Sequence, residues 1–329
     1  DTGSLPDQGA PLSGIRYPVS GIGLTLLCLF AAIGSSCSKS IPVDATGGQT
    51  LRLSQRNEPA NLDPALATLP DEFAILRAVS EGLLIPGENG GTPRPGVATR
   101  VEVSPDGLVH TYHLRPDARW SDGEPVTATD FVASYRRLLT PATAAPKASV
   151  FYPVKNARAF VSGKLTDFSL VGFKAIDTRT LVITLEQPTP RFAYYVSSGP
   201  WLPVPLRVIE KHGRDWLRPE NFVGNGPFTL AEWRPDQRII VTKNPHWHGA
   251  ATVRLTHIHF LRSDSGDTEE RAYRAGQADV TMAVPFSKID TYAQERPAEL
   301  HRSPLLETRY FSFNTRRRPL DDPRVRRAL

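Results

Sequence analysis

The chain is longer than one hydrophobic core usually covers, and this property constrains its fold most. It has 329 residues, whereas single cores stop growing beyond roughly 250–300 residues. We therefore expect at least two domains. Apolar residues make up 40% and charged residues 22% of the sequence. These values are close to globular averages, which excludes a wholly disordered or fibrous chain.

A short apolar segment lies near the N-terminus. Arg16 precedes an uncharged stretch whose strongly apolar part, 22–33, is 12 residues long. A membrane span needs about 20 residues, so this length favours the apolar region of a signal peptide. Small residues then lead to Cys37, in a pattern that resembles a bacterial lipoprotein signal. We expect residues 1–37 to be a signal peptide with Cys37 as the lipidated residue. An ordinary cleaved signal and a retained anchor are the alternatives.

Cysteine usage and charge exclude several classes of function. The two cysteines are Cys28 and Cys37, so residues 38–329 can hold neither a disulfide nor a thiolate metal site nor a catalytic cysteine. The net charge of +5 equals the charge of residues 308–329 alone, which contain seven arginines and two aspartates. A positive charge confined to one end argues against a polyanion-binding surface. We expect no nucleic-acid partner, and membrane contact only through the N-terminal signal or lipid anchor.

Strand and helix patterns are mixed along the body of the chain, without a strict βαβ rhythm. Alternating apolar residues predict strands at 50–53, 227–233, 238–243, 253–261 and 278–282, and strand pairs over 101–114 and around 177–179. Helical spacing predicts helices at 73–83, from Thr127 or Thr129 to Pro141, at 267–275, at 287–296, and from Pro323 with Asp322 as N-cap. The patterns indicate an exported α/β protein with several domains.

No complete catalytic motif occurs in the sequence. The serine nucleophile elbow, the HExxH zinc motif, the P-loop and a complete GxGxxG are all absent. The strongest metal candidates are the pairs His246/His248 and His257/His259. Zinc needs three or four ligands, so we favour ordinary structural positions for these histidines. We therefore predict no cofactor, no metal site and no enzymatic activity.

Several stretches, in collinear order, resemble the solute-binding proteins of bacterial peptide ABC transporters, the family 5 extracellular solute-binding proteins. The most specific stretch runs from Tyr112-His113-Leu114-Arg115 to Trp120-Ser121-Asp122-Gly123-Glu124-Pro125. The other matching stretches are 57–64, 80–84, 95–98, 130–135, 224–228, 243–247, and Asn314 with 319–329. The resemblance covers the chain from about residue 50 to its end.

The resemblance implies an α/β fold of the periplasmic-binding-protein type II kind, multi-lobed and with an inserted extra domain. Domain I would be discontinuous, formed by 38–72 and 190–308, and domain II would be the insertion, 73–189. Domain III would begin at 309 and be represented only by 309–329. The third lobe would then be largely missing, and the chain would be C-terminally truncated relative to this family.

The resemblance also implies a function outside the cytoplasm, in the periplasm or at the cell surface. Two lobes would close by a hinge around an extended oligopeptide, which would be delivered to ABC transporter permease subunits. The residues that would face the peptide are Glu58, Pro59, Ala60, Asn61, Met282, Ala283, Tyr310, Phe313 and Asn314. The first three would offer mostly backbone contacts, and the last five would line side-chain pockets.

Three alternatives remain open from the sequence. The proposed site residues also fit core packing or strand ends. The same fold also binds other solutes, such as a nickel chelate, an opine or a murein peptide. An exported, lipid-anchored hydrolase is the alternative from a different class, although it would need a convergent nucleophile and base that no motif supplies.

Overall fold

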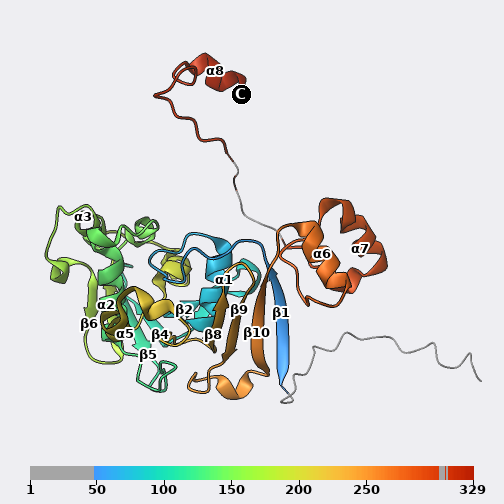
Figure 1. The fold of residues 1–329 in the computed structure, drawn as a ribbon. Coiled ribbons are helices and arrows are strands. Elements are labelled where there is room, and N and C mark those ends of the chain that lie inside the picture. Colours follow the sequence, from blue (N-terminus) through green and yellow to red (C-terminus); the bar gives the residue numbers. More distant parts are fainter. Residues whose placement is uncertain (1–47, 304–307, 309) are drawn as a thin grey trace, which may run out of the picture. The chain divides into compact units, whose positions relative to one another are not determined.

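Two four-stranded sheets organise the part of the protein that the structure describes. Figure 1 shows the ribbon with its helices and strands. The computed structural model describes residues 48–303, 308 and 310–329. The predicted signal peptide, residues 1–37, and the predicted lipidation site Cys37 lie outside the described residues. None of the helices in the described part of the chain has the length and apolarity needed to cross a membrane.

The first sheet has the strand order β1-β10-β9-β8. Its strands are β1 (Gln49–Gln55), β8 (Phe228–Arg234), β9 (Arg238–Lys243) and β10 (Leu255–Arg262). β1 pairs with β10 in parallel, and the other pairs are antiparallel. Because side chains alternate across a strand, the apolar residues of these strands share one face. This face packs against helix α1 (Pro70–Val79) in one buried apolar cluster.

The second sheet has the strand order β4-β5-β7-β6, and all its pairs are antiparallel. Its strands are β4 (Ala98–Val103), β5 (Val109–Leu114), β6 (Phe173–Ala175) and β7 (Thr180–Thr184). Helix α2 (Ala128–Leu139) contributes Tyr135 to a second buried apolar cluster. The ring centroid of Tyr135 lies 5.0 to 6.1 Å from those of four other aromatic residues, Phe131, Phe151, Phe173 and Trp201. Such tilted contacts stabilise aromatic cores beyond their buried area.

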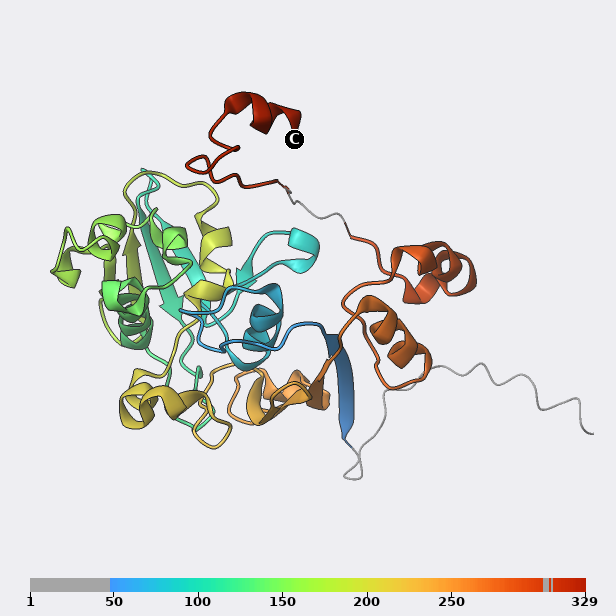
Figure 2. The same cartoon turned by 45° about the horizontal axis from the view of Figure 1, so that its top comes forward.

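Shorter elements connect and extend the two sheets. They are β2 (Leu84–Ile85), β3 (Arg94–Pro95), α3 (Ala157–Val161), α4 (Phe192–Val196), α5 (Leu206–His212), α6 (Gly266–Arg274), α7 (Ile289–Glu295) and α8 (Pro323–Ala328), with 3-10 turns such as η5 (Gly199–Trp201), η8 (Phe286–Lys288) and η9 (Pro297–Glu299). The pair α6 and α7 follows β10 in the chain. Figures 1 and 2 both show α6 next to β1, and a backbone bridge between Leu53 and Val280 ties the segment after α6 to that strand.

Most of the predicted elements are confirmed. The hairpin over 101–114 is formed by β4 and β5, and strand 238–243 is β9. Thr127 caps α2, since its side chain accepts a hydrogen bond from the amide of Asp130 at 3.3 Å. Asp322 likewise caps α8 through the amide of Arg324, at 2.8 Å.

Two predicted elements differ from the structure. The helix predicted over 73–83 begins at Pro70 and ends at Val79. It ends early because the backbone amide and carbonyl of Glu81 bond the side chain of Asn225, at 2.9 and 2.8 Å. The strand predicted over 278–282 is wrong, since only Val280 forms a bridge. The amide of Met282, which would continue the parallel ladder, instead donates to the carboxylate of Glu269 at 2.9 Å.

The buried apolar residues form two clusters, one with each sheet. The predicted division into domain I (38–72 and 190–308), domain II (73–189) and domain III (from 309) stays a prediction, because two clusters alone do not fix these boundaries. The α/β class is evident from the two sheets and the helices packed on them.

Candidate ligand-binding site

The segment 56–61 directly follows β1 and contains the first predicted contact residues, 58–61. Acidic side chains hold it along its length. The guanidinium of Arg56 pairs with Glu269 at 2.8 Å, and the side-chain amide of Asn57 donates to Asp71 at 2.6 Å. The carboxylate of Glu58 accepts from the indole of Trp233 at 2.7 Å. The Glu58 side chain is therefore turned toward the first sheet.

The buried carboxylate of Glu72 fixes the backbone after Glu58. One of its oxygens accepts from the amides of Ala60 and Asn61, at 3.0 and 3.2 Å. The other accepts from the amides of Thr68 and Leu69, at 2.7 and 2.8 Å. These four donors are engaged inside the protein. A ligand can meet this stretch only through carbonyl oxygens or side chains, because Pro59 has no amide hydrogen to give.

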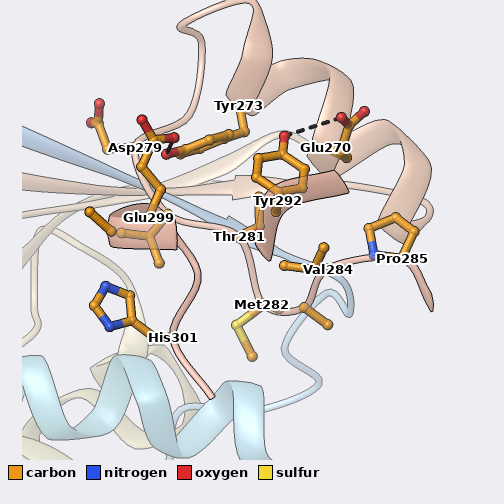
Figure 3. A pocket seen from close by; sticks show the side chains of 13 residues that line it. Glu270, Tyr273, Asp279, Thr281, Met282, Val284, Pro285, Tyr292, Glu299 and His301 are labelled. Carbon is orange, nitrogen blue, oxygen red and sulfur yellow. Dashed lines mark hydrogen bonds between the residues drawn. The ribbon is translucent and has the colours of Figure 1, made fainter. Parts of the chain in front are cut away.

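The second predicted contact pair, Met282 and Ala283, lines a cavity of about 420 Å³. Figure 3 shows Tyr273 and Glu270 on one side of this cavity and Met282 on the other. The Met282 side chain is 48% exposed, so it is available to a bound molecule. The remaining lining residues are Asp279, Val280, Thr281, Val284, Pro285, Tyr292, Ala298, Glu299 and His301.

Two tyrosines of the cavity are tied to glutamates. The hydroxyl of Tyr292 donates to Glu270 at 3.1 Å, and the hydroxyl of Tyr273 donates to Glu299. Burial first and the Glu299 hydrogen bond second raise the pKa of Tyr273 to about 12. The same two causes, burial and the bond to Glu270, raise the pKa of Tyr292. Both phenols therefore stay protonated at neutral pH and act as hydrogen-bond donors.

An ion pair connects Asp279, one of the lining residues of the cavity, to β1. The guanidinium of Arg52 donates to both carboxylate oxygens of Asp279, at 3.0 and 2.8 Å. The hydrogen bond to Asp279 is the main cause that raises the pKa of Arg52. This two-pronged geometry fixes orientation as well as distance. The segment that follows α6 is thereby held in register with β1.

The third predicted group lies in the C-terminal segment. Tyr310 and Asn314 are exposed, and Phe313 is half-buried. None of these three residues is among the described residues that line the cavity beside α6 and α7. Of the predicted side-chain contacts, Met282 and Ala283 therefore line this cavity, and the C-terminal group does not.

The histidine pairs occupy different environments. His248 lies between Glu81 and Arg115, at 2.8 and 2.6 Å from their side chains. Because a guanidinium only donates, Nδ1 of His248 accepts from Arg115, and Nε2 donates to Glu81. The rings of His257 and His259 lie 6.3 Å apart on one strand face. Within the described residues, no cluster of three or more His, Cys, Asp or Glu side chains is arranged to hold a metal ion.

The sequence analysis did not identify the two buried glutamates whose carboxylates hold the backbone of the predicted contact segments. Glu72 and Glu269 are buried at 1% and 0% exposure, and each accepts several hydrogen bonds. Each lies near the start of a helix, which is where acidic residues are common for a different reason, the helix dipole. A second cavity, of about 460 Å³, lies where α1 ends and is lined by Arg77, Glu81, Leu84, Ser197, Leu202 and Trp247 among others.

Comparisons with known proteins identify the group to which the chain is similar. Residues 92–329 match the model of the bacterial extracellular solute-binding proteins, family 5 Middle. The probable deoxycholate-binding periplasmic protein YgiS of Escherichia coli is 39% identical over 284 residues, which is 85% of this chain and 52% of that protein. The periplasmic oligopeptide-binding protein OppA of Escherichia coli is 39% identical over 287 residues, with the same shares of 85% and 52%. The chain spans about half the length of the curated relatives it matches.

Solved structures show the same likeness. The murein tripeptide binding protein MppA of Escherichia coli has a TM-score of 0.81 at 35% identity, covering 85% of this chain and 54% of that one. Haemophilus influenzae OppA in complex with the peptide RPPGFSPFR has a TM-score of 0.77 at 31% identity, covering 87% of this chain and 56% of that one. The α/β fold expected from the resemblance is therefore confirmed, and the chain belongs to the bacterial extracellular solute-binding proteins of family 5.

Proposed function

We propose that this chain is part of an extracytoplasmic protein that captures oligopeptides and delivers them to the permease subunits of an ABC transporter. One observation carries the proposal. The described fold matches, over 87% of the chain, a protein whose structure was solved with a nonapeptide, RPPGFSPFR. A likeness over nearly the whole chain supports the same class of ligand, although fold alone does not decide function.

The geometry of the site supports an extended ligand. Within the 58–61 segment, the amides of Ala60 and Asn61 are bound to Glu72, so a peptide would pair with the carbonyl oxygens of these residues. An extended peptide has amide donors that pair with such carbonyls, which gives affinity without reading side chains. Beside α6 and α7, the cavity with Met282 offers room for an apolar side chain. A backbone clamp combined with a tolerant pocket suits a binder of many peptides.

The residues that we propose to face the peptide are Glu58, Pro59, Ala60, Asn61, Met282, Ala283, Tyr310, Phe313 and Asn314. Within this group, Glu58 would contact the peptide through its backbone only, because its side-chain carboxylate is bound to the indole of Trp233. Closure of two lobes by a hinge would then cover the peptide.

The proposal is tested by isothermal titration of peptides into the protein expressed from its full reading frame. Mixed peptides of two to nine residues are expected to bind, and a saturating peptide is expected to raise the free energy of unfolding by about 2.7 kcal/mol at one hundred times the dissociation constant. A fluorogenic peptide assay run in parallel separates binder from hydrolase. Turnover of the peptide, or the absence of any binding, would overturn the proposal.

A second class of ligand deserves a direct comparison, because a relative with 39% identity is named as deoxycholate-binding and one with 36% identity as murein peptide-binding. Neither figure separates these ligands from the oligopeptides of OppA, which is also 39% identical. Competition titrations with deoxycholate, a murein tripeptide and an unrelated tripeptide decide among them. Peptide binding that deoxycholate fails to displace supports the oligopeptide proposal.

We further propose that the mature protein is a lipoprotein anchored through Cys37. The named periplasmic relatives support a location outside the cytoplasm, and the sequence pattern before Cys37 supports the anchor. Labelling of the expressed protein with an alkynyl fatty acid is expected to be lost in Cys37→Ser. Equal labelling of the wild type and the variant, or no labelling of either, would contradict the anchor.

A further inference from the structure

Glu269 joins the two contact segments of the proposed site. It lies on α6, and its side chain is 0% exposed. One carboxylate oxygen accepts from Nε of Arg56 at 2.8 Å. The other accepts from the amide of Met282 at 2.9 Å and, more weakly, from the amide of Ala283 at 3.5 Å. A single buried group thus connects residues that are far apart in the sequence.

An ordinary ion pair explains only half of this arrangement. The Arg56 side chain is 43% exposed, and half-exposed pairs contribute little to stability. A completely buried carboxylate needs further hydrogen bonds to offset its lost hydration. The amides of Met282 and Ala283 supply them, and for this reason the chain leaves the strand ladder after Val280. The carboxylate therefore sets the path of the backbone at 282–283.

Two further contacts constrain Arg56. Its carbonyl accepts from the guanidinium of Arg262. At Gly266, the first residue of α6, an added Cβ would come within 3.1 Å of Nη2 of Arg56, so the glycine leaves room for the guanidinium. The backbone of Arg56 is thus bound by Arg262 of β10, and its side chain has room beside Gly266 of α6. The link from Arg56 through Glu269 to Met282 therefore has a hydrogen bond at each end.

We infer that Glu269 is a positioning residue of the ligand site. It sets the distance between the backbone of the 56–61 segment and the wall formed by Met282 and Ala283, so that both are in place before a ligand arrives. This inference rests on the proposed peptide-binding function. Preorganised contacts strengthen binding because less motion has to be frozen on association.

The variant that tests the inference is Glu269→Gln. Glutamine keeps the volume, but one oxygen becomes an NH₂ group that only donates. That group would face either the guanidinium of Arg56 or the amide of Met282, both of which are donors. One side of the link must therefore break. The matched control is Asp63→Asn, another buried carboxylate that pairs with an arginine, Arg137, and with a backbone amide, that of Ala65.

The first measurement reports on the link itself. Met282 is the only methionine among the 329 residues, and an initiator methionine has no amide hydrogen. In protein from the full reading frame labelled with ¹⁵N-methionine, the amide cross-peak that disappears in Met282→Leu therefore belongs to the donor in question. The Met282 amide proton is expected to move upfield in Glu269→Gln, because its charged acceptor is either lost or replaced by a neutral amide oxygen. Asp63→Asn is expected to leave this cross-peak unchanged. An unmoved cross-peak would overturn the inference.

The second measurement reports on the ligand site, with protein from the full reading frame. The affinity for a peptide that binds the wild type is expected to fall about ten-fold or more in Glu269→Gln, since a hydrogen bond to a charged group is lost. The expected fall in Asp63→Asn is under two-fold, about 0.4 kcal/mol or less. A lost Met282 link with unchanged affinity would show that Glu269 is structural only, and would overturn the positioning role. A wild type that binds no peptide would overturn the proposed function and this role with it, while the cross-peak would still show whether the link exists.

Discussion

The carboxylate of Glu72 allows the sharpest stability prediction. It accepts four backbone amides, two on each oxygen, and thereby closes the loop between residues 60 and 69. In Glu72→Gln, the remaining oxygen can keep one pair of amides, but the NH₂ group faces the other pair and cannot accept from it. Two backbone amides, on residues that are exposed or half-buried, then lose their acceptor.

The expected loss follows from these two donors. A hydrogen bond contributes about 0.5–1.5 kcal/mol net to stability, so the two lost bonds predict a loss of about 1–3 kcal/mol in the free energy of unfolding. Urea unfolding followed by tryptophan fluorescence measures it. The control is Glu88→Gln, whose side chain is 80% exposed and pairs with Arg94. That surface pair predicts a loss of about 1 kcal/mol or less. A loss below about 1 kcal/mol in Glu72→Gln would refute the reasoning.

Three further predictions concern single residues. Burial lowers the pKa of His110, so the folded state favours the neutral ring. Stability is therefore expected to fall as the pH drops below about 6.5, where the unfolded chain binds the proton. In urea titrations, His110→Phe should lose less stability than the wild type between about pH 7 and pH 5, and equal losses would contradict this. In Gly199→Ala, the new Cβ would meet Phe73 at 1.9 Å, so a loss of about 1–3 kcal/mol is expected, and an unchanged unfolding midpoint would be incompatible with the packing. Removing the N-cap in Thr127→Ala should cost about 1 kcal/mol, measured by the same unfolding midpoint, and a more stable variant would speak against the cap.

Local structure followed from the sequence where short-range rules decide it. Thr127 with Asp130 and Asp322 with Pro323 carry helix-start chemistry that holds in any tertiary setting. The hairpin of β4 and β5 has its turn at Gly107, whose φ of +71° suits glycine. These signals lie within a few residues of the structure that they specify.

The site was harder to predict because its supports act over long range. Val280 and Met282 alternate as in a strand, yet Met282 gives its amide to Glu269 instead of to β1. Likewise, no local pattern marks Glu72 as the acceptor of amides from Ala60 and Leu69. The sequence marks the segments that we propose as the site, but only the fold shows which of their donors are already engaged.

The central claim, that this chain belongs to a peptide-capturing protein, is tested most directly by the ligand that the protein carries when it is purified. The protein from the full reading frame would be isolated without denaturation, and the molecules released from it identified by mass spectrometry. The account predicts a mixture of short peptides with varied sequences, because a backbone clamp does not select side chains. A single bile acid, a metal chelate or another non-peptide solute in stoichiometric amount would contradict it.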